Sequence, residues 1–390
     1  MKNTFKIAAG ALALTAATAF AGQYPFPQNM KHPHGTTIEY ADTKVVKAHY
    51  EAWKKAWYDA SQGWVLAPEG TCSTVSEAIA YGMLITVYMD EEDVFKKLYN
   101  TWKTNGGNGA GMNWRIGCEG GTGSATDADE DAALALVMAS KQWNNTSYLS
   151  DAKTLIGWIA QNDIDGNNSL KPGNQWSAAL NPSYVMLGHY YLFEKVTGDS
   201  KWSTIRQKAA KDLLACQDAT TGLVGDWCDW SSHKPVLTNA AVSNDIGYYD
   251  DASRTPWRTA MAYYWYGDTK AQAFNKKIVD WLIPETHTAS GVNSGYMYAN
   301  GKYEADLSTK RNFVSSSFSG GLGLATSSFA DNKNAVTYLG TVYNVLKELK
   351  SCETAQGCAH DCQSPSGEGS TAQGHCSSSR YRSPAHQPPF

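Results

Sequence analysis

Between residues 44 and 350, apolar residues recur mainly three or four positions apart, which is the spacing of one face of an α-helix. Loops rich in Gly, Asn, Asp and Ser separate these stretches, and no run alternates as a series of strands would. The body is therefore expected to be all-α. About ten to twelve helices in one domain favour helical hairpins closed into a ring. The expected helices include residues 45–58, 78–88, 132–143, 184–196 and 335–349.

The two ends of the chain differ from this helical body. Lys2 and Lys6 precede an apolar run at residues 7–20, and Ala19-Phe20-Ala21 fits a cleavage site, so residues 1–21 are expected to be a secretory signal peptide. No run of eighteen apolar residues follows, so we expect a secreted protein without a membrane anchor. Residues 22–350 form the expected folded domain, and residues 351–390, rich in Cys, Ser and Gly, form an expected disordered tail.

Charge and cysteine content narrow the possible partners. The formal charge is −4, and it becomes −6 once Lys2 and Lys6 are removed, with no basic run of the kind that nucleic-acid-binding proteins carry. Eight cysteines in an exported chain favour disulfides over metal sites. Cys216 and Cys228 are close enough in sequence to close a local loop, and Cys72 and Cys118 could join two segments, but the pairing stays open. Four cysteines lie in the tail, namely Cys352, Cys358, Cys362 and Cys376. Their spacing fits no zinc finger, so no metal is expected.

Three acidic segments lie at or just before the start of an expected helix. The first, residues 73–83, contains Glu77. Thr74 stands three residues earlier, so this pair also fits a capping box, in which Glu77 would only satisfy backbone N–H groups. Taken alone, the segment favours that structural role.

The second acidic segment, residues 124–131, carries Asp127, Asp129, Glu130 and Asp131 within five positions. These side chains could cap the helix or form a solvated face, or a polar ligand or a shared proton could relieve their repulsion. Their spacing differs from that of an EF-hand calcium loop.

The third acidic segment, residues 248–258, places Asp250 and Asp251 in the loop before a helix that begins near Pro256. Arg254 is close enough to pair with one aspartate, which would also fit a surface ion pair. Hydrolysis of a glycosidic bond by inversion needs one carboxylic acid, one carboxylate that activates water, and no cofactor. The three segments can supply both groups.

The residues around Asp127 resemble the signature of glycoside hydrolase family 8, the bacterial endoglucanase family. Ala125-Thr126-Asp127-Ala128-Asp129 and the later Trp143 fit it, while Ala132 stands where Ile or Met is usual, a change in a packing residue. The resemblance covers about residues 25–350. Further matching segments are residues 76–77, 81–83, 112–114, 171–176, 181–184, 222–228 and 254–258.

This resemblance implies a secreted, inverting endo-β-1,4-glucanase with an (α/α)6 barrel, whose long rim loops form the substrate cleft. By motif position, Glu77 is the expected proton donor, Asp127 holds the sugar at the cleavage site, and Asp251 is the expected base. The family position before the base is more often Tyr, and here it is Asp250. Asp250 is therefore the alternative base.

Aromatic residues on the matching loops are candidates for substrate binding, because an exposed ring can stack on a sugar. Each of these rings could instead belong to the core. The expected substrate-binding residues are Trp114, Trp176, Tyr184, Trp227 and Arg254.

Two alternatives accompany the prediction of a β-1,4-glucan substrate. The same mechanism could act on xylan, mixed-linkage glucan or chitosan, and Asp250 leaves chitosan possible. A protein of a different class, a non-catalytic carbohydrate-binding protein, should have lost one of the acidic pair, which this chain retains. The expected protein is a monomer that binds no nucleic acid.

Overall fold

The computed structural model describes residues 22–28, 30–38, 41–67, 72–106, 111–237, 246–307 and 314–348. The expected signal peptide (1–21) and the expected tail (351–390) lie outside the described residues, as do the four tail cysteines. The expected folded domain is thus described apart from short gaps and its last two residues.

The described part of the chain is mainly helical, as the apolar spacing predicts. Every stretch expected to be a helix overlaps one, although residue 58 lies in a short strand, residue 143 follows the end of α4, residues 184–186 precede the start of α6 and residue 349 is outside the described residues. The helices are α1 (Thr43–Trp57), α2 (Ser76–Tyr88), α3 (Glu92–Asn105), α4 (Thr126–Gln142), α5 (Thr146–Asn162), α6 (Leu187–Thr197), α7 (Lys201–Cys216), α8 (Thr255–Tyr266), α9 (Thr269–Thr286), α10 (Ser316–Leu324) and α11 (Lys333–Glu348).

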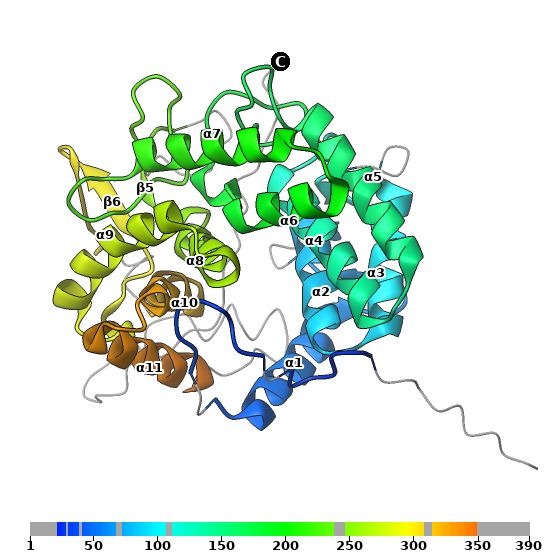
Figure 1. Cartoon of the computed structure of the whole chain (residues 1–390), viewed down its shortest axis with the longest axis horizontal. Coiled ribbons are helices and arrows are strands. Elements are labelled where there is room, and N and C mark those ends of the chain that lie inside the picture. The colour runs from blue at the N-terminus through cyan, green and yellow to red at the C-terminus, as the bar shows by residue number, and fades with distance from the viewer. Residues whose placement is uncertain are drawn as a thin grey trace, which may run out of the picture.

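The helices are arranged around a ring, with α2, α4, α6, α8 and α10 on its inner side and α3, α5, α7, α9 and α11 outside them (Figure 1). Each inner helix packs against the next inner helix, and each also packs against the outer helix that follows it in the chain. Inner helices are therefore covered on several sides. In α4, fifteen of the seventeen residues are buried, whereas the only buried residue of α1 is Tyr50.

Loop length differs between the two ends of these helix pairs. Only a few residues join α2 to α3, α4 to α5, α6 to α7 and α8 to α9, so the helices of each pair run in opposite directions. Long segments instead lead into α4, α6, α8 and α10. All inner helices therefore begin at the same end of the ring, where the long loops gather.

Short strands, which the apolar pattern does not predict, interrupt the helical fold. Two-residue ladders join β1 (Tyr58–Asp59) to β2 (Trp64–Val65) and β3 (Thr74–Val75) to β4 (Arg115–Ile116). A three-stranded antiparallel sheet contains β5 (Gly247–Tyr248), β6 (Tyr296–Ala299) and β7 (Lys302–Ala305). Its hairpin turns at Asn300-Gly301, both with positive φ, and such an Asn-Gly pair is a local hairpin signal.

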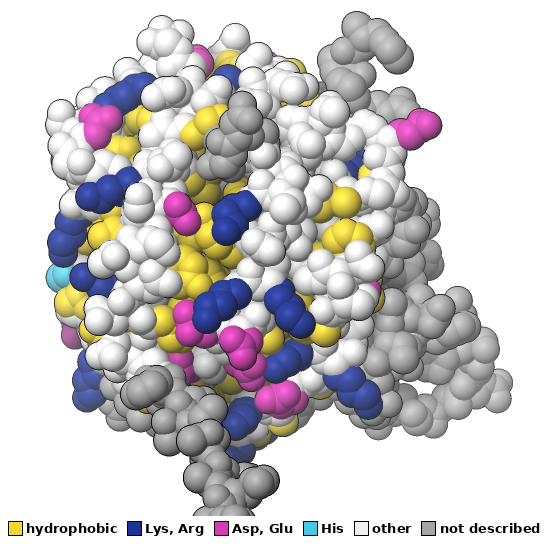
Figure 2. All heavy atoms as spheres, turned by 90° about the vertical axis from the view of Figure 1, so that its right-hand side faces the viewer, with side chains coloured by type: hydrophobic (Ala, Val, Ile, Leu, Met, Phe, Trp, Pro, Cys, Tyr) yellow, Lys and Arg dark blue, Asp and Glu magenta, His cyan; other side chains and the backbone are white. Residues whose placement is uncertain are grey.

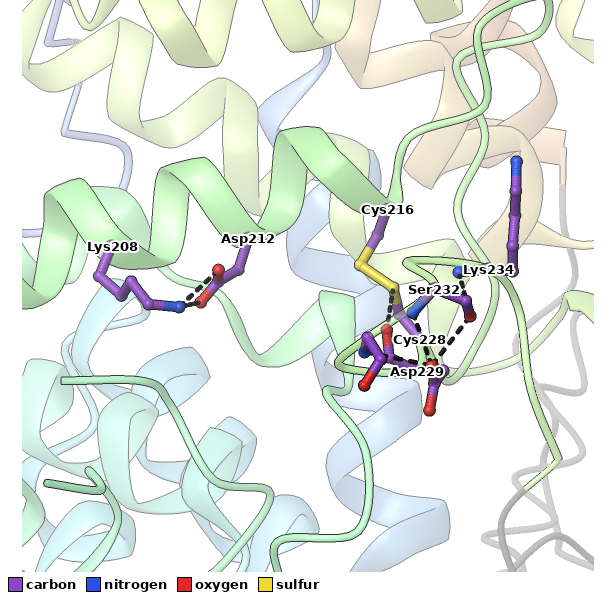
Figure 3. Close-up of a disulfide and its surroundings, with 8 residues drawn as sticks. Lys208, Asp212, Cys216, Cys228, Asp229, Ser232 and Lys234 are labelled. Atoms are coloured by element: carbon purple, nitrogen blue, oxygen red, sulfur yellow. Dashed lines mark hydrogen bonds and ion pairs between the residues drawn. A yellow bond between two sulfur atoms is a disulfide. The ribbon is translucent and has the colours of Figure 1, made fainter. Parts of the chain in front are cut away.

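Two disulfides stabilise the long loops. Cys72–Cys118 joins the segment before β3 to the segment after β4, and Cys216–Cys228 joins the last residue of α7 to the loop that follows it (Figure 3). Both pairs are among those that the sequence allows. No described cysteine is free.

The described surface carries charges of both signs. On the face in Figure 2, Lys and Arg side chains lie beside Asp and Glu side chains. Within the described ranges, no helix is both long enough and apolar enough to cross a membrane.

Candidate active site

Two of the predicted acidic residues lie at the start of inner helices, and the third lies just before the short helix that leads into another inner helix. Glu77 and Asp127 are the second residues of α2 and α4, and Asp251 directly precedes the short helix η3 (Ala252–Arg254) that runs into α8. Because the inner helices all begin at one end of the ring, these residues meet there despite their distance in sequence.

Arg254 brings the three carboxylates together. Its Nη1 donates to Glu77 Oε1 and, at 3.0 Å, to Asp127 Oδ2, while its Nη2 donates to Asp251 Oδ1 at 2.7 Å. All four side chains are largely or fully buried. A single guanidinium thus contacts three acidic groups in a buried site, so retention of a proton in the cluster is favoured.

The pKa values of the cluster follow this excess of negative charge. Burial, and then the charge of Glu77, raise the pKa of Asp127 to about 7, although Arg254 acts in the opposite direction. Burial also raises the pKa of Asp251, while Arg254 and a hydrogen bond from Asn181 limit the rise. Asp127 thus retains a proton near neutral pH, which shows that the cluster can hold a proton of the kind that general acid catalysis requires.

Asp127 offers one free acceptor at this site. Its Oδ2 accepts from Arg254, whereas no donor among the described residues reaches its Oδ1, which is buried. A buried carboxylate oxygen without a donor is costly unless a ligand supplies the missing hydrogen bond. The geometry therefore fits a hydroxyl-bearing ligand at Asp127.

Two neighbours fix the position of Asp251, and sequence reasoning assigned no role to either. Asn181 Nδ2 donates to Asp251 Oδ2 at 2.8 Å, while Asn181 Oδ1 accepts from Ser183, which sets the orientation of the amide. Asp226 Oδ1 accepts from the backbone N–H groups of Tyr249 and Ala252, on either side of Asp251. Asp250, the alternative base, precedes Asp251 and is partly exposed.

A second polar layer lies one helical turn below the first. Asp131 stands four residues after Asp127, and Arg258 four residues after Arg254, and these two form a buried ion pair at 2.9 Å. Arg258 also donates to Tyr81, four residues after Glu77, and His189 contacts Asp131 at 3.0 Å. Burial opposes ionisation of Asp131, but Arg258 and the hydrogen bond with His189 lower its pKa overall. Because Asp131, Arg258 and Tyr81 each follow a residue of the first layer by four positions, that spacing in the sequence could have indicated the layer.

The structural alternatives for these acidic segments are wrong. Val75, not Thr74, is the N-cap of α2, and Ala125 is the N-cap of α4, and neither makes a side-chain capping bond. Residues 127 and 129–131 are all buried, so they form no solvated face. The ion pair of Arg254 with Asp251 is confirmed, but it is buried and not at the surface.

The candidate substrate-binding rings differ in exposure. Trp176 is partly exposed and meets Trp114 edge to face, with ring centroids 5.8 Å apart. Trp114, Tyr184 and Trp227 are buried. The ring of Tyr184 lies 5.5 Å from the Arg254 guanidinium, and Trp227 directly precedes the disulfide-bonded Cys228. Trp176 is thus the ring best placed to contact a ligand directly, and binding roles for the other three stay predictions.

No set of three or more His, Cys, Asp or Glu side chains in the described ranges is arranged to hold a metal ion. The arrangement of Glu77, Asp127, Asp251 and Arg254 is instead suited to proton transfer between carboxyl groups and a bound molecule.

Comparison with known proteins gives a consistent picture. The family model for glycosyl hydrolases family 8 matches residues 24–342. Endoglucanase 2 of Ruminiclostridium josui is 34% identical over 302 residues, which cover 70% of this chain and 64% of that protein. Endoglucanase A of Acetivibrio thermocellus is 34% identical over 317 residues, which cover 75% of this chain and 64% of that protein. The chain therefore spans slightly less than two thirds of the length of these relatives.

Solved structures agree with this fold. An apo β-1,3-1,4-glucanase from Paenibacillus sp. X4 superposes with a TM-score of 0.71 at 27% identity, covering 82% of this chain and 91% of that one. A reducing-end-xylose-releasing exo-oligoxylanase superposes with a TM-score of 0.59 at 17% identity, covering 78% and 87%, and supports the fold alone. The match over residues 24–342 shows that the chain belongs to glycosyl hydrolases family 8.

Proposed function

We propose that this protein is a secreted, inverting endo-β-1,4-glucanase that hydrolyses internal bonds of cellulose-type glucans. The observation that carries the proposal is the buried cluster in which Arg254 contacts Glu77 of α2, Asp127 of α4 and Asp251 in the segment that leads into α8. Family membership and relatives named endoglucanase support the reaction class. Residues 1–21 would direct export, and the ring of hairpins would close as an (α/α)6 barrel that acts as a monomer.

In this proposal, Glu77 protonates the leaving glycosidic oxygen, and Asp251 accepts a proton from the attacking water. Asp127 Oδ1, which no donor among the described residues reaches, accepts a hydrogen bond from a hydroxyl of the sugar at the cleavage site. Asn181 and Arg254 both contact Asp251, and they would favour its ionised form, as a base requires. Trp176 would stack on a glucosyl ring beside the cleavage site, and the long rim loops would form the cleft.

The first test compares substrates. Reducing-end release and viscosity loss are measured on carboxymethylcellulose, xylan and chitosan, using wild-type protein, Glu77→Gln and Glu92→Gln. Glu92 is the matched control because it also lies in the first turn of a helix, α3. We expect rapid loss of cellulose viscosity, a Glu77→Gln variant at least 100-fold slower, and a control near wild type. Cleavage of xylan or chitosan alone would overturn the glucan assignment, and cleavage of no polymer would favour a binding protein.

The second test separates the two candidate bases. Asp250→Asn and Asp251→Asn change adjacent residues by the same chemical step, and only Asp251→Asn should abolish turnover. Proton NMR of the first products should show the α-anomer, because inversion of a β-linkage produces it. Release of the β-anomer, or loss of activity in Asp250→Asn alone, would refute the mechanism or the choice of base.

A further inference from the structure

A second pair of acidic side chains meets outside the cluster around Arg254. Asp129, in the first turn of α4, is hydrogen-bonded through its side chain to Asp163, the C-cap of α5, and both are fully buried. Asp129 Oδ1 accepts from the Met112 backbone N–H at 3.3 Å, and Asp163 Oδ1 accepts from Ser124 Oγ at 3.1 Å. In each carboxyl, Oδ2 is buried and no N–H or hydroxyl donor of the described residues reaches it. The hydrogen bond between the two side chains can therefore use both Oδ2 atoms, with one proton between them.

Two buried carboxylates in contact cannot both be ionised, so such a pair retains one proton. The charged or titratable neighbours of Asp163 do not remove this conflict. Lys171 acts on it at longer range and donates its Nζ to Asn174 O, and Glu130 is itself a buried acid. Burial, and then Asp163, raise the pKa of Asp129 well above its ordinary range. Burial raises the pKa of Asp163 to about 7.

The pair connects the two loops that carry Trp114 and Trp176. Met112, which donates to Asp129, precedes Trp114 by two residues. Ser124, which donates to Asp163, exchanges two hydrogen bonds with Asn174, at 3.0 and 3.1 Å, and Asn174 precedes Trp176 by two residues. The contact between the two Trp rings therefore depends on loops that meet at these carboxyls.

We propose that Asp129 and Asp163 are positioning residues, and that one proton shared between them holds the loops of Trp114 and Trp176 in the arrangement that binds the glucan. The link to glucan binding rests on the proposed function, whereas the shared proton does not. When alkaline pH removes this proton, two buried negative charges repel each other and the loops separate. The loss should weaken substrate binding, in addition to any change that deprotonation of Asp127 causes near pH 7.

Isosteric substitutions test the shared proton. In Asp129→Asn, the amide oxygen keeps the bond from Met112 and the amide N–H group replaces the acid proton at every pH. Asp163→Asn likewise leaves one donor between the two side chains. The double variant puts two amide N–H groups face to face, with no acceptor between them. Each single variant should therefore fold well, and the double variant should be less stable than the two single effects predict.

The measurements are melting temperature and the Michaelis constants from pH 6 to pH 10, on the full mature protein. For wild type, stability should fall as pH rises through this range until the shared proton is lost, because the unfolded chain has already lost its carboxyl protons near pH 4 while the folded protein keeps this one. The KM for carboxymethylcellulose should rise about tenfold over this range with a smaller change in kcat, since a stacked ring contributes about that much binding. In Asp129→Asn, both the melting temperature and KM should lose the part of this pH dependence that comes from the pair, while the part that comes from Asp127 remains.

Two results would overturn the proposal. One is an Asp129→Asn variant whose melting temperature and KM follow the wild-type pH dependence. The other is a double variant whose loss of stability equals the sum of the losses in the two single variants. Asp93→Asn is the control, because the Asp93 side chain is 99% exposed and should leave both curves unchanged. The melting curves need no substrate, so a failure of the proposed function would not be mistaken for a failure of the shared proton.

Discussion

The pKa of Asp127 predicts that replacing this residue with Asn makes the protein inactive but more stable at neutral pH. Arg254 faces three acidic groups, so Asp127→Asn still leaves Arg254 with Glu77 and Asp251 as partners. The substitution removes one buried charge that burial and Glu77 both destabilise. Activity should fall at least 100-fold if Asp127 holds the sugar at the cleavage site.

The magnitude follows from the pKa itself. A carboxyl with a pKa of about 7 in the folded protein, against an ordinary 3.8, prefers its protonated form. The fold therefore has the full benefit of this group below pH 4 and loses it as pH rises to about 7. At 1.36 kcal/mol for each pH unit, the loss is at most roughly 4 kcal/mol. The Asn variant does not titrate, so it should escape this loss.

The assay is denaturant unfolding of wild type and Asp127→Asn at pH 4 and pH 8. The new amide N–H lacks a buried acceptor and costs about 1–3 kcal/mol, but it costs the same at both pH values. We therefore expect the difference in free energy of unfolding to move by about 2–4 kcal/mol in favour of the variant between pH 4 and pH 8. Asp93→Asn should show no such movement. A difference that stays constant with pH would refute the claim that Asp127 carries a raised pKa.

Two further predictions concern the residues around the cluster. Asn181→Ala removes a hydrogen bond to the Asp251 carboxylate, so kcat/KM should fall about 10- to 100-fold. The acidic limb of the pH–rate profile should also move to higher pH, because the pKa of Asp251 rises without this bond. An unchanged limb would show that Asn181 does not lower the pKa of Asp251. Asp131→Asn leaves the buried Arg258 without its countercharge and should lower the free energy of unfolding by about 3–5 kcal/mol. Adding Arg258→Met to that variant should recover part of the loss, and a further loss would contradict this explanation.

The sequence by itself determined the helices and the family motifs. The three- and four-residue apolar spacing locates α1, α2, α4, α6 and α11, because a helix that buries one face must repeat with its own turn. It also narrowed the disulfides, since Cys216 and Cys228 are twelve residues apart and can pair within one loop. The sequence did not predict the short strands, because a two-residue ladder is too short to show an alternation of apolar and polar residues.

Only the tertiary structure decided what each acidic residue contacts. In its local sequence, Glu77 resembles a helix cap, and Asp127 resembles a capping or solvent-exposed residue. Nothing in either segment indicates a contact with Arg254, which lies 177 residues after Glu77 and 127 residues after Asp127. The same holds for Asn181 beside Asp251 and for Asp163 beside Asp129. The physical reason is that long loops enter every inner helix from the same end, so side chains from distant segments share one buried, poorly solvated site, and their charges and protons depend on that shared environment.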